Sequence, residues 1–502
     1  MEFRMSSPQD KPDKTQRMRP RRSQLTVLSP SDIERINDAA LHLLEQVGFS
    51  DVTPSGAEAM TRAGALVGAD GRIRFPRRMV LASIDKAARG FTLFGQDSSH
   101  DLPLGTARVH YGTAGAAVQF VEAETGLYRE ARLQDLYDAA RLAESLPHIH
   151  FFQRPMVARD IADPLAMDIN TLYACLSGTT KHVGTSFAVR EHVAPALDMV
   201  HMVAGGEAKF RARPFVSNSN AFVISPMQFA EQACGVLEAC VAGGLPILLL
   251  ATGQAGSTAP QSLAGAVAQT VAEVLAGLVY VNALKPGHPA IFGAWPFASD
   301  PRSGKMASGS AEQSLLAAAC AEMAGFYDLP CGSGAGMTEA RLPDIQSGYE
   351  KGMTEVMAGF AGLDLVYEAA GMHASLIGFC HESLILDNDL IGQCLRCLEG
   401  IEVTGETLSL DEIAAVCVDG PRHYLASDPV ARDQRYRPAL ADRSGSQQRE
   451  SSGWPSIVER ATVEKNRLLT TFFPRHIPKT MDERIRARFG DLIQLPRAAM
   501  GL

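Results

Sequence analysis

The stretch PILLLATGQAGSTAPQSLAGAVAQTVAEVLAGLVYVNALKPGHPAIFGAWPF, residues 246–297, contains two short apolar runs separated by one long apolar segment. The runs Pro246–Ala251 and Pro289–Phe292 have the unbroken apolar character of parallel strands that are buried on both faces. The segment between them, near 260–285, is long enough to be the crossover helix that two parallel strands require. The stretch therefore predicts a strand–helix–strand unit.

The same alternation continues in both directions along the chain. Other strands are predicted at Phe151–Val157, His182–Phe187, Pro214–Ser217, Leu329–Cys331 and Asp364–Tyr367, with a last one between Ala374 and Leu386. Helices are predicted near 164–177, 190–204, 226–242, 310–326 and 345–361. Roughly eight strand–helix units in about 270 residues favour a closed (β/α)₈ TIM barrel over an open doubly wound sheet.

The flanking regions follow different patterns. Near the N-terminus, Ser29 can cap a helix, and a later hairpin is indicated where Val118–Val121 and Leu127–Arg129 flank a Glu-Thr-Gly turn. We therefore expect an α/β protein with a TIM barrel, a small N-terminal α+β region and a C-terminal helical extension. The expected boundaries are 1–25 for a disordered basic tail, 26–130 for the α+β region, 131–404 for the barrel and 405–502 for the α-rich extension.

Composition narrows the class of protein. The 502 residues carry a formal net charge of −9, with 46% hydrophobic and 21% charged residues, which excludes global disorder. The acidic balance argues against a nucleic-acid binder. The arginine-rich tail is followed by no apolar signal region, and the nine cysteines fit reduced thiols better than a disulfide framework. A cytoplasmic enzyme is predicted.

One segment requires a membrane test. The apolar run Ser262–Leu284 is long enough to span a bilayer, but Gln269 and Glu273 interrupt it and no basic flank precedes it. Its alanine and glycine content suits a helix that packs tightly inside a domain. We therefore expect a buried helix and no membrane association.

The predicted strand ends carry small residues and aromatic side chains. In a TIM barrel, the loops at the carboxyl ends of the strands build the active site. Five aromatic side chains are expected near this mouth, namely Tyr111, Phe187, Trp295, Phe297 and Tyr367. Aromatic rings around a cavity can bind a quaternary ammonium ion by cation–π attraction. The alternative is that these rings fill the top of the barrel or pack beneath the N-terminal region.

Motifs for other cofactors are weak or absent. Cys394 and Cys397 form a single C-x-x-C pair in a helical context, which favours a structural role over zinc or redox chemistry. Residues 332–336 lack the dinucleotide-binding fingerprint and its acidic partner. The consecutive residues 380–382 are Cys-His-Glu, but neighbours in sequence rarely face one ion. No metal site is predicted.

Several motifs, taken in order along the chain, resemble the trimethylamine methyltransferase family. They are Gly112-Thr113-Ala114-Gly115-Ala116-Ala117, Glu122-Ala123-Glu124-Thr125-Gly126, Thr179-Thr180-Lys181-His182-Val183, the run TEARLPDIQ at 338–346, Gly348-Tyr349-Glu350-Lys351 and Gly420-Pro421-Arg422-His423-Tyr424-Leu425. The resemblance extends over about residues 30–490, and the ordered series is more specific than any single motif.

This resemblance implies an enzyme that moves a methyl group from an amine to the cobalt of a corrinoid. The corrinoid (cobalamin) is carried by a separate binding protein, so this chain is expected to hold no cofactor tightly. Founding members of this methanogenesis-related family contain pyrrolysine. This sequence contains none, and so resembles the non-pyrrolysine branch, for which quaternary amines such as glycine betaine are the expected substrates. Self-association is open, and so is the exact amine.

Two further residues are candidates for holding the carboxylate of a betaine. Arg341 follows the sixth predicted strand and could bind a carboxylate bidentately, and His373 could donate a hydrogen bond to it. The alternatives are a surface ion pair for Arg341 and a structural histidine. Glu339 and Asp344 either orient Arg341 or cap the next helix. No catalytic residue is assigned.

The chemistry also suggests what the pocket should be like. Positive charge on the nitrogen is lost as the methyl group leaves, so a tight ionic site would stabilise the ground state more than the transition state. An aromatic pocket without carboxylates is the expected compromise. Two other hypotheses remain at this point: a barrel lyase or hydrolase that uses Arg341 to bind a small carboxylate, and a non-catalytic betaine-binding protein.

Overall fold

The computed structural model describes residues 25–418, 420, 422–424, 436–444, 453 and 455–501. The predicted basic tail therefore lies outside the described residues, apart from Leu25. Part of the family-like motif at residues 420–425 also lies outside them, since Pro421 and Leu425 are not described.

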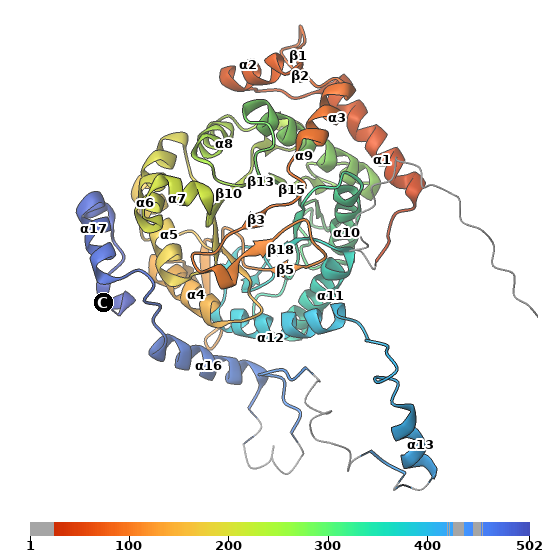
Figure 1. Cartoon of the computed structure of the whole chain (residues 1–502). Coiled ribbons are helices and arrows are strands. Elements are labelled where there is room, and N and C mark those ends of the chain that lie inside the picture. Colours follow the sequence, from red (N-terminus) through yellow and green to blue (C-terminus); the bar gives the residue numbers. More distant parts are fainter. Residues whose placement is uncertain are drawn as a thin grey trace, which may run out of the picture.

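Eight parallel strands form a closed barrel, which confirms the predicted fold (Figure 1). In chain order they are β5 (His110–Tyr111), β8 (Phe151–Gln153), β9 (His182–Thr185), β10 (Val216–Asn220), β13 (Ile247–Ala251), β15 (Ala290–Ala294), β17 (Gly332–Gly334) and β18 (Leu365–Tyr367). Strand β18 pairs with β5, with Leu365 opposite His110. Single bridges between Gly112 and Phe151 and between Phe292 and Cys331 complete the ring.

The barrel begins and ends elsewhere than the sequence indicated. Strand β5 lies in the barrel, although the sequence placed it in the separate region 26–130. A strand does lie between Ala374 and Leu386, but it is not a barrel strand. It is β20 (Gly378–Phe379), which pairs antiparallel with β19 (Met372–His373), and helix α12 begins soon after it. Strand β5 was assigned to the N-terminal region because it has only two residues and pairs with strands that are distant in the sequence.

Helices cover the outside of the barrel, as expected for crossovers. They are α4 (Leu133–Ser145), α5 (Pro164–Gly178), α6 (Val193–Ala204), α7 (Glu207–Ala212), α8 (Glu231–Gly243), α9 (Leu263–Leu284), α10 (Ala311–Phe326), α11 (Ile345–Ala361) and α12 (His381–Leu398). Their starts follow ordinary capping chemistry: the side chains of Asp163, Ser310 and Asp344 accept hydrogen bonds from backbone N–H groups of the first turn.

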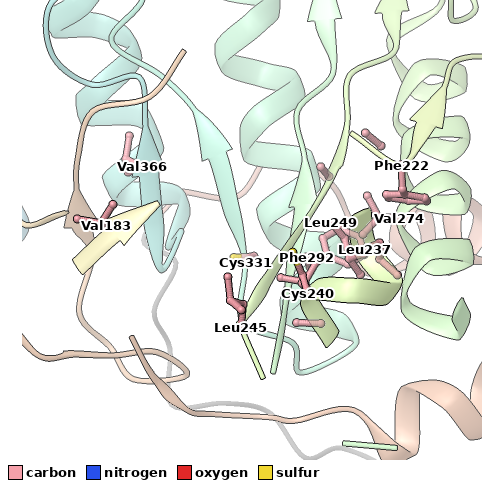
Figure 2. Packing of buried hydrophobic residues seen from close by; sticks show 14 of the residues in the cluster. Val183, Phe222, Leu237, Cys240, Leu245, Leu249, Val274, Phe292, Cys331 and Val366 are labelled. Carbon is pink, nitrogen blue, oxygen red and sulfur yellow. The ribbon is translucent and has the colours of Figure 1, made fainter. Parts of the chain in front are cut away.

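The hydrophobic core between strands and helices is continuous around the ring. Figure 2 shows part of it, where Leu249 of β13 and Phe292 of β15 lie with Leu237 of α8 and Val274 of α9. Among the described residues, α9 is the one helix apolar and long enough to cross a membrane, and 89% of its apolar window is buried. This confirms that Ser262–Leu284 forms a buried helix.

The N-terminal elements cover one side and the bottom of the barrel. Helices α1 (Pro30–His42), α2 (Pro54–Arg62) and α3 (Arg77–Lys86) pack against α9, and a π-helical turn, Leu43–Val47, follows α1. The short hairpin of β3 (Thr92–Leu93) and β4 (Leu102–Pro103) closes the bottom, because Leu93, Leu102 and Leu104 pack with residues inside the barrel. A separate two-stranded sheet pairs β1 (Leu66–Val67) with β2 (Ile73–Arg74).

A small sheet stands over one side of the barrel mouth. It joins β6 (Gln119–Glu122) and β7 (Leu127–Glu130), which follow β5, to β19 and β20, which follow β18. The β6–β7 hairpin is the one predicted from the sequence. Two further pairs lie in the strand-end loops, β11 (Val223–Ile224) with β12 (Gln228–Phe229) and β14 (Gln254–Ala255) with β16 (Phe297–Ala298).

The C-terminal part of the chain is helical where it is described. It contains α13 (Leu410–Val418), α16 (Ile457–Thr471) and α17 (Lys479–Phe489). Helix α16 packs against α12, and Lys465 forms a 2.6 Å ion pair with the buried Glu382. Asp482 of α17 accepts hydrogen bonds from Tyr173, Arg486 and Arg497, which fixes this helix against α5.

Candidate active site at the barrel mouth

A half-open cavity of about 600 Å³ lies at the carboxyl ends of the strands. Its walls come from the ends of seven strands, β5, β8, β9, β10, β13, β15 and β18, and the loops that follow them. This is the place where a TIM barrel carries its chemistry. The side chains that line the cavity include Arg154, Phe187, Asn220, Trp295, Phe297 and Glu368.

Three of the predicted aromatic residues line this cavity. Phe187, Trp295 and Phe297 form part of its wall. The indole N–H of Trp295 donates a 2.9 Å hydrogen bond to the Gly332 carbonyl, which fixes the ring. Tyr367 lies below, with its ring centroid 5.2 Å from that of Trp295, and belongs to the packed interior of the barrel. The aromatic rings therefore both fill the barrel and line its mouth.

Tyr111 is not part of this group. Its side chain is fully buried, and its hydroxyl donates a 3.0 Å hydrogen bond to the Glu355 carbonyl of α11. The side chain therefore packs between the barrel wall and a covering helix. Side chains alternate between the two faces of a strand, and the Tyr111 side chain lies on the face that points outward to the helices.

Arg341 lies outside the cavity, on the surface. Its guanidinium stands 4.9 Å from the centre of the Tyr128 ring of β7, and the Tyr128 hydroxyl donates a hydrogen bond to the Arg341 carbonyl. This contact attaches the loop after β17 to the sheet over the mouth. The proposed role of Arg341 in binding a carboxylate is not supported by this geometry.

His373 has the surroundings expected of a structural histidine, which was the alternative to a role in binding the carboxylate. It is completely buried, and its two ring nitrogens lie 3.1 Å from the Ala340 carbonyl and 2.6 Å from the Ser383 hydroxyl. Burial lowers its pKa to about 3, so the ring stays neutral at physiological pH. With both nitrogens occupied, His373 holds the loop after β17 to the start of α12.

The two acidic neighbours of Arg341 also have partners other than the guanidinium. Glu339 accepts hydrogen bonds from the backbone N–H and hydroxyl of Ser308 and from the Ser375 hydroxyl. Asp344 caps α11 through the Ser347 N–H at 2.9 Å. For Asp344 the helix-capping alternative is therefore the observed one.

Glu368 is the acidic group of the cavity, and sequence reasoning assigned it no role. It follows β18, is 2% exposed and lines the cavity. Its Oε2 has no hydrogen-bond partner among the described residues. Burial raises the pKa of this carboxyl to about 8. Its φ of 60° is in the left-handed region, a strained conformation that is concentrated at functional sites.

Arg154 is the basic group of the cavity and was likewise missed. It follows β8 directly, where the sequence predicted a longer strand, Phe151–Val157. One Nη donates a 2.9 Å hydrogen bond to the Ser186 hydroxyl, while Nε has no partner in the part of the chain that the structure describes. Burial lowers the pKa of its guanidinium. A third unpaired atom, Oδ1 of Asn220, belongs to the same cavity.

A family-like motif lies at the opposite end of the barrel. In the run 179–183, Thr179 and Thr180 donate hydrogen bonds to Glu144, and Lys181 donates to the carbonyls that end α4. These contacts join the start of strand β9 to the end of helix α4. The motif therefore supports the fold, and none of its side chains lines the cavity.

The chain is similar to known proteins over nearly its whole length. The family model described as "Trimethylamine methyltransferase (MTTB)" matches residues 3–493, nearly the whole chain. The chain belongs to this family. The resemblance seen in the sequence is confirmed, and the protein is an amine methyltransferase.

Individual family members are distant but align over most of their length. The chain is 27% identical over 466 residues to a trimethylamine methyltransferase MttB of Desulfitobacterium hafniense, covering 92% of this chain and 93% of the relative. It is 26% identical over 470 residues to a glycine betaine methyltransferase of the same species, covering 92% and 96%. The solved structure of the hydroxylamine MtmB complex covers 88% of this chain and 92% of its own, with 11% identity and a TM-score of 0.48.

Proposed function

We propose that this amine methyltransferase transfers a methyl group from a quaternary amine to a cobalt corrinoid that a partner protein presents at the barrel mouth. The observation that carries the proposal is Glu368, a buried carboxyl with an unpaired oxygen, in a cavity that Trp295, Phe187 and Phe297 also line. A carboxyl group and aromatic rings are the protein groups that attract an organic cation. The residues needed to hold a quaternary ammonium thus share one cavity.

The carboxyl is a departure from the carboxylate-free pocket expected from the sequence. The raised pKa of Glu368 explains how a pocket with a carboxyl group can attract the cation without being a tight ionic site. Because burial keeps Glu368 mostly protonated near pH 7, the empty cavity carries little fixed negative charge. A bound cation favours the ionised form, so the group gains charge as the amine enters. Aromatic rings supply attraction that does not depend on this proton.

The role of this chain in the reaction is binding and alignment. The reduced corrinoid supplies the nucleophilic metal centre that accepts the methyl group. The rigid ring of Trp295, held by its hydrogen bond to Gly332, and the carboxyl of Glu368 fix the position of the ammonium group within the cavity. Holding the reacting groups in line contributes most of the rate enhancement in such a displacement.

Small residues in the cavity wall support the approach of a large planar group. Ala114, Gly115 and Ala116 line the cavity after β5 and carry the smallest side chains available. Small residues allow another surface to come close. The lyase or hydrolase hypothesis depended on Arg341, which lies on the surface.

Glycine betaine is the first substrate to test. One relative of similar distance is a glycine betaine methyltransferase, whereas another is a trimethylamine methyltransferase. A quaternary nitrogen already bears the charge that makes a neutral tertiary amine leave. Trimethylamine lacks that charge, and a chain without pyrrolysine has no corresponding activating residue.

The test combines binding with methyl transfer. The purified protein is titrated calorimetrically with tetramethylammonium, glycine betaine and trimethylamine, and then assayed for methylation of cob(I)alamin. We expect both quaternary amines to bind, and Trp295→Leu to weaken tetramethylammonium binding about 5-fold to 10-fold, while the enzyme-dependent methylation is lost. Phe326→Leu, which changes an exposed ring on α10, is the matched control and is expected to change neither. Binding or turnover of trimethylamine alone would contradict the proposal.

A further inference from the structure

We propose that Arg154 binds a carboxylate on the amine substrate, so that the substrate is a zwitterion with a quaternary ammonium group and a carboxylate in one molecule. This inference rests on the proposed function and specifies its substrate class. The carboxylate-binding role expected of the surface residue Arg341 is assigned to Arg154, which lines the cavity.

The first argument is the unfilled bonding capacity of Arg154. A guanidinium has five N–H donors. Within the described residues, the side chain of Arg154 makes one hydrogen bond, to the Ser186 hydroxyl, and its Nε is buried without an acceptor. Arg154 is half-buried, and a cation that places an N–H group out of water normally has a paired anion, because leaving water without such compensation costs free energy. The cavity lacks that anion until a ligand supplies it.

The second argument concerns Asp168, a carboxylate that is already engaged. Asp168 of α5 acts on Arg154 at long range. Its Oδ2 accepts a 2.7 Å hydrogen bond from His192 and a 2.9 Å hydrogen bond from the Ala188 N–H. No ion pair joins Asp168 to Arg154 in the described part of the chain. The guanidinium therefore keeps its capacity for a two-point contact with a carboxylate.

The third argument is the placement of Arg154 relative to the cation site. Arg154 follows β8 and Glu368 follows β18, and β5 lies between these two strands in the ring. Neighbouring strands are about 4.8 Å apart, so the two strand ends are separated by roughly 10 Å. The positive and negative side chains thus enter one cavity from separate positions, without an ion pair between them among the residues described. A small zwitterion can bridge them with each charge facing its opposite.

The position of Arg154 is also well fixed. Its backbone N–H donates a 2.9 Å hydrogen bond to the Gly184 carbonyl of β9, and its side chain is held by Ser186 two residues further along. A guanidinium held before the ligand arrives loses less conformational entropy on binding. This arrangement favours a role in selecting carboxylate-bearing amines over amines of similar shape without one.

The experiment compares two ligands and two arginines. Dissociation constants are measured calorimetrically for glycine betaine and for tetramethylammonium, which shares the ammonium group but has no carboxylate. Arg154→Gln is expected to weaken glycine betaine binding about 30-fold or more and to change tetramethylammonium binding less than about 3-fold. The matched control is Arg341→Gln, which is expected to leave both ligands within about 2-fold.

The outcomes separate this inference from the proposed function. If the wild-type protein binds neither ligand, the proposed function fails. If it binds both and Arg154→Gln weakens the two equally or weakens neither, the cation site stands and the role of Arg154 is overturned. Should Arg154→Gln fail to fold, Ser186→Ala serves instead, with an expected loss of about 3-fold for glycine betaine alone. Equal affinities in that variant and the wild type would overturn the inference.

Discussion

Lys181 at the bottom of the barrel and the two charged residues at its mouth differ in their hydrogen bonding. At the bottom, the ammonium of Lys181 donates hydrogen bonds of 2.5, 2.8 and 2.5 Å to the carbonyls of Ala143, Leu146 and Ile149. At the mouth, Arg154 Nε and Glu368 Oε2 have no partner among the described residues. Lys181 and Glu368 are each 2% exposed, so the difference between them lies in how completely their hydrogen-bonding groups are paired.

The same physical cause acts at both ends with different results. Burial lowers the pKa of Lys181 to about 8 and raises the pKa of Glu368 to about 8. Lys181 is compensated by three carbonyl groups, and it joins a strand to a helix. Glu368 is not compensated within the protein. Lys181 has partners and helps to hold this fold together, whereas the unpaired atoms of Arg154 and Glu368 belong to residues that line a cavity open to a ligand.

The largest effect is expected at the bottom. Lys181→Met keeps most of the side-chain volume but leaves three buried carbonyls without their donor. We expect the free energy of unfolding to fall by about 3 kcal/mol or more, measured by urea denaturation. The exposed Lys209 is the control, and Lys209→Met should stay within about 0.5 kcal/mol of the wild type. A small loss for Lys181→Met would remove the contrast between the two ends.

An effect of opposite sign is expected at the mouth. The pKa of Glu368 is raised from 4.5 to about 8, so between these values the folded protein binds more protons than the unfolded chain. The free energy of unfolding contributed by this group therefore falls as the pH rises through that range. Glu368→Gln removes the penalty and should stabilise the protein by about 1–3 kcal/mol at pH 8, with little gain at pH 5.

Urea denaturation at these two pH values measures the difference. Glu191→Gln, at an exposed position, is the control and should give no pH-dependent gain. The same Glu368→Gln variant should also bind tetramethylammonium more weakly. A stabilisation that is equal at pH 5 and pH 8 would show that Glu368 is not held in its protonated form.

The smallest effect concerns Tyr111, which sequence reasoning placed with the mouth. Tyr111→Phe removes the hydroxyl that donates to the Glu355 carbonyl and should cost about 1 kcal/mol of stability. Because the side chain faces α11, amine binding should remain unchanged, as measured by calorimetry. Weaker binding in this variant would place Tyr111 in the cavity wall after all.

Much of the fold could be predicted from the sequence because most barrel strands are continuous apolar runs. The run Pro246–Ala251 is an example, since β13 occupies nearly the same residues. Strand β5 was assigned to the wrong region for a physical reason. It has two residues, and its place in the ring depends on pairing with β18, which the local sequence does not encode.

The sequence predicted that the site lies at the carboxyl ends of the strands, but it did not predict all of the side chains that line it. Trp295 and Phe187 line the cavity, because residues that directly follow barrel strands are constrained to the mouth. Arg341 lies farther along its loop, where the direction of a side chain depends on tertiary contacts such as that with Tyr128. The special features of Arg154 and Glu368 are their missing partners, and a missing partner is a property of the folded structure alone.

The pairing of the first barrel strand with the last has a consequence for biosynthesis. Leu365 of β18 lies opposite His110 of β5, so 255 residues of chain separate the two partners. At a synthesis rate of about 5–20 residues per second, the ribosome needs roughly 13–50 s to produce the second partner after the first. During that interval one edge of β5 has no strand beside it. The nascent chain should therefore depend on chaperones until β18 emerges, and premature termination before residue 365 should yield an aggregating fragment.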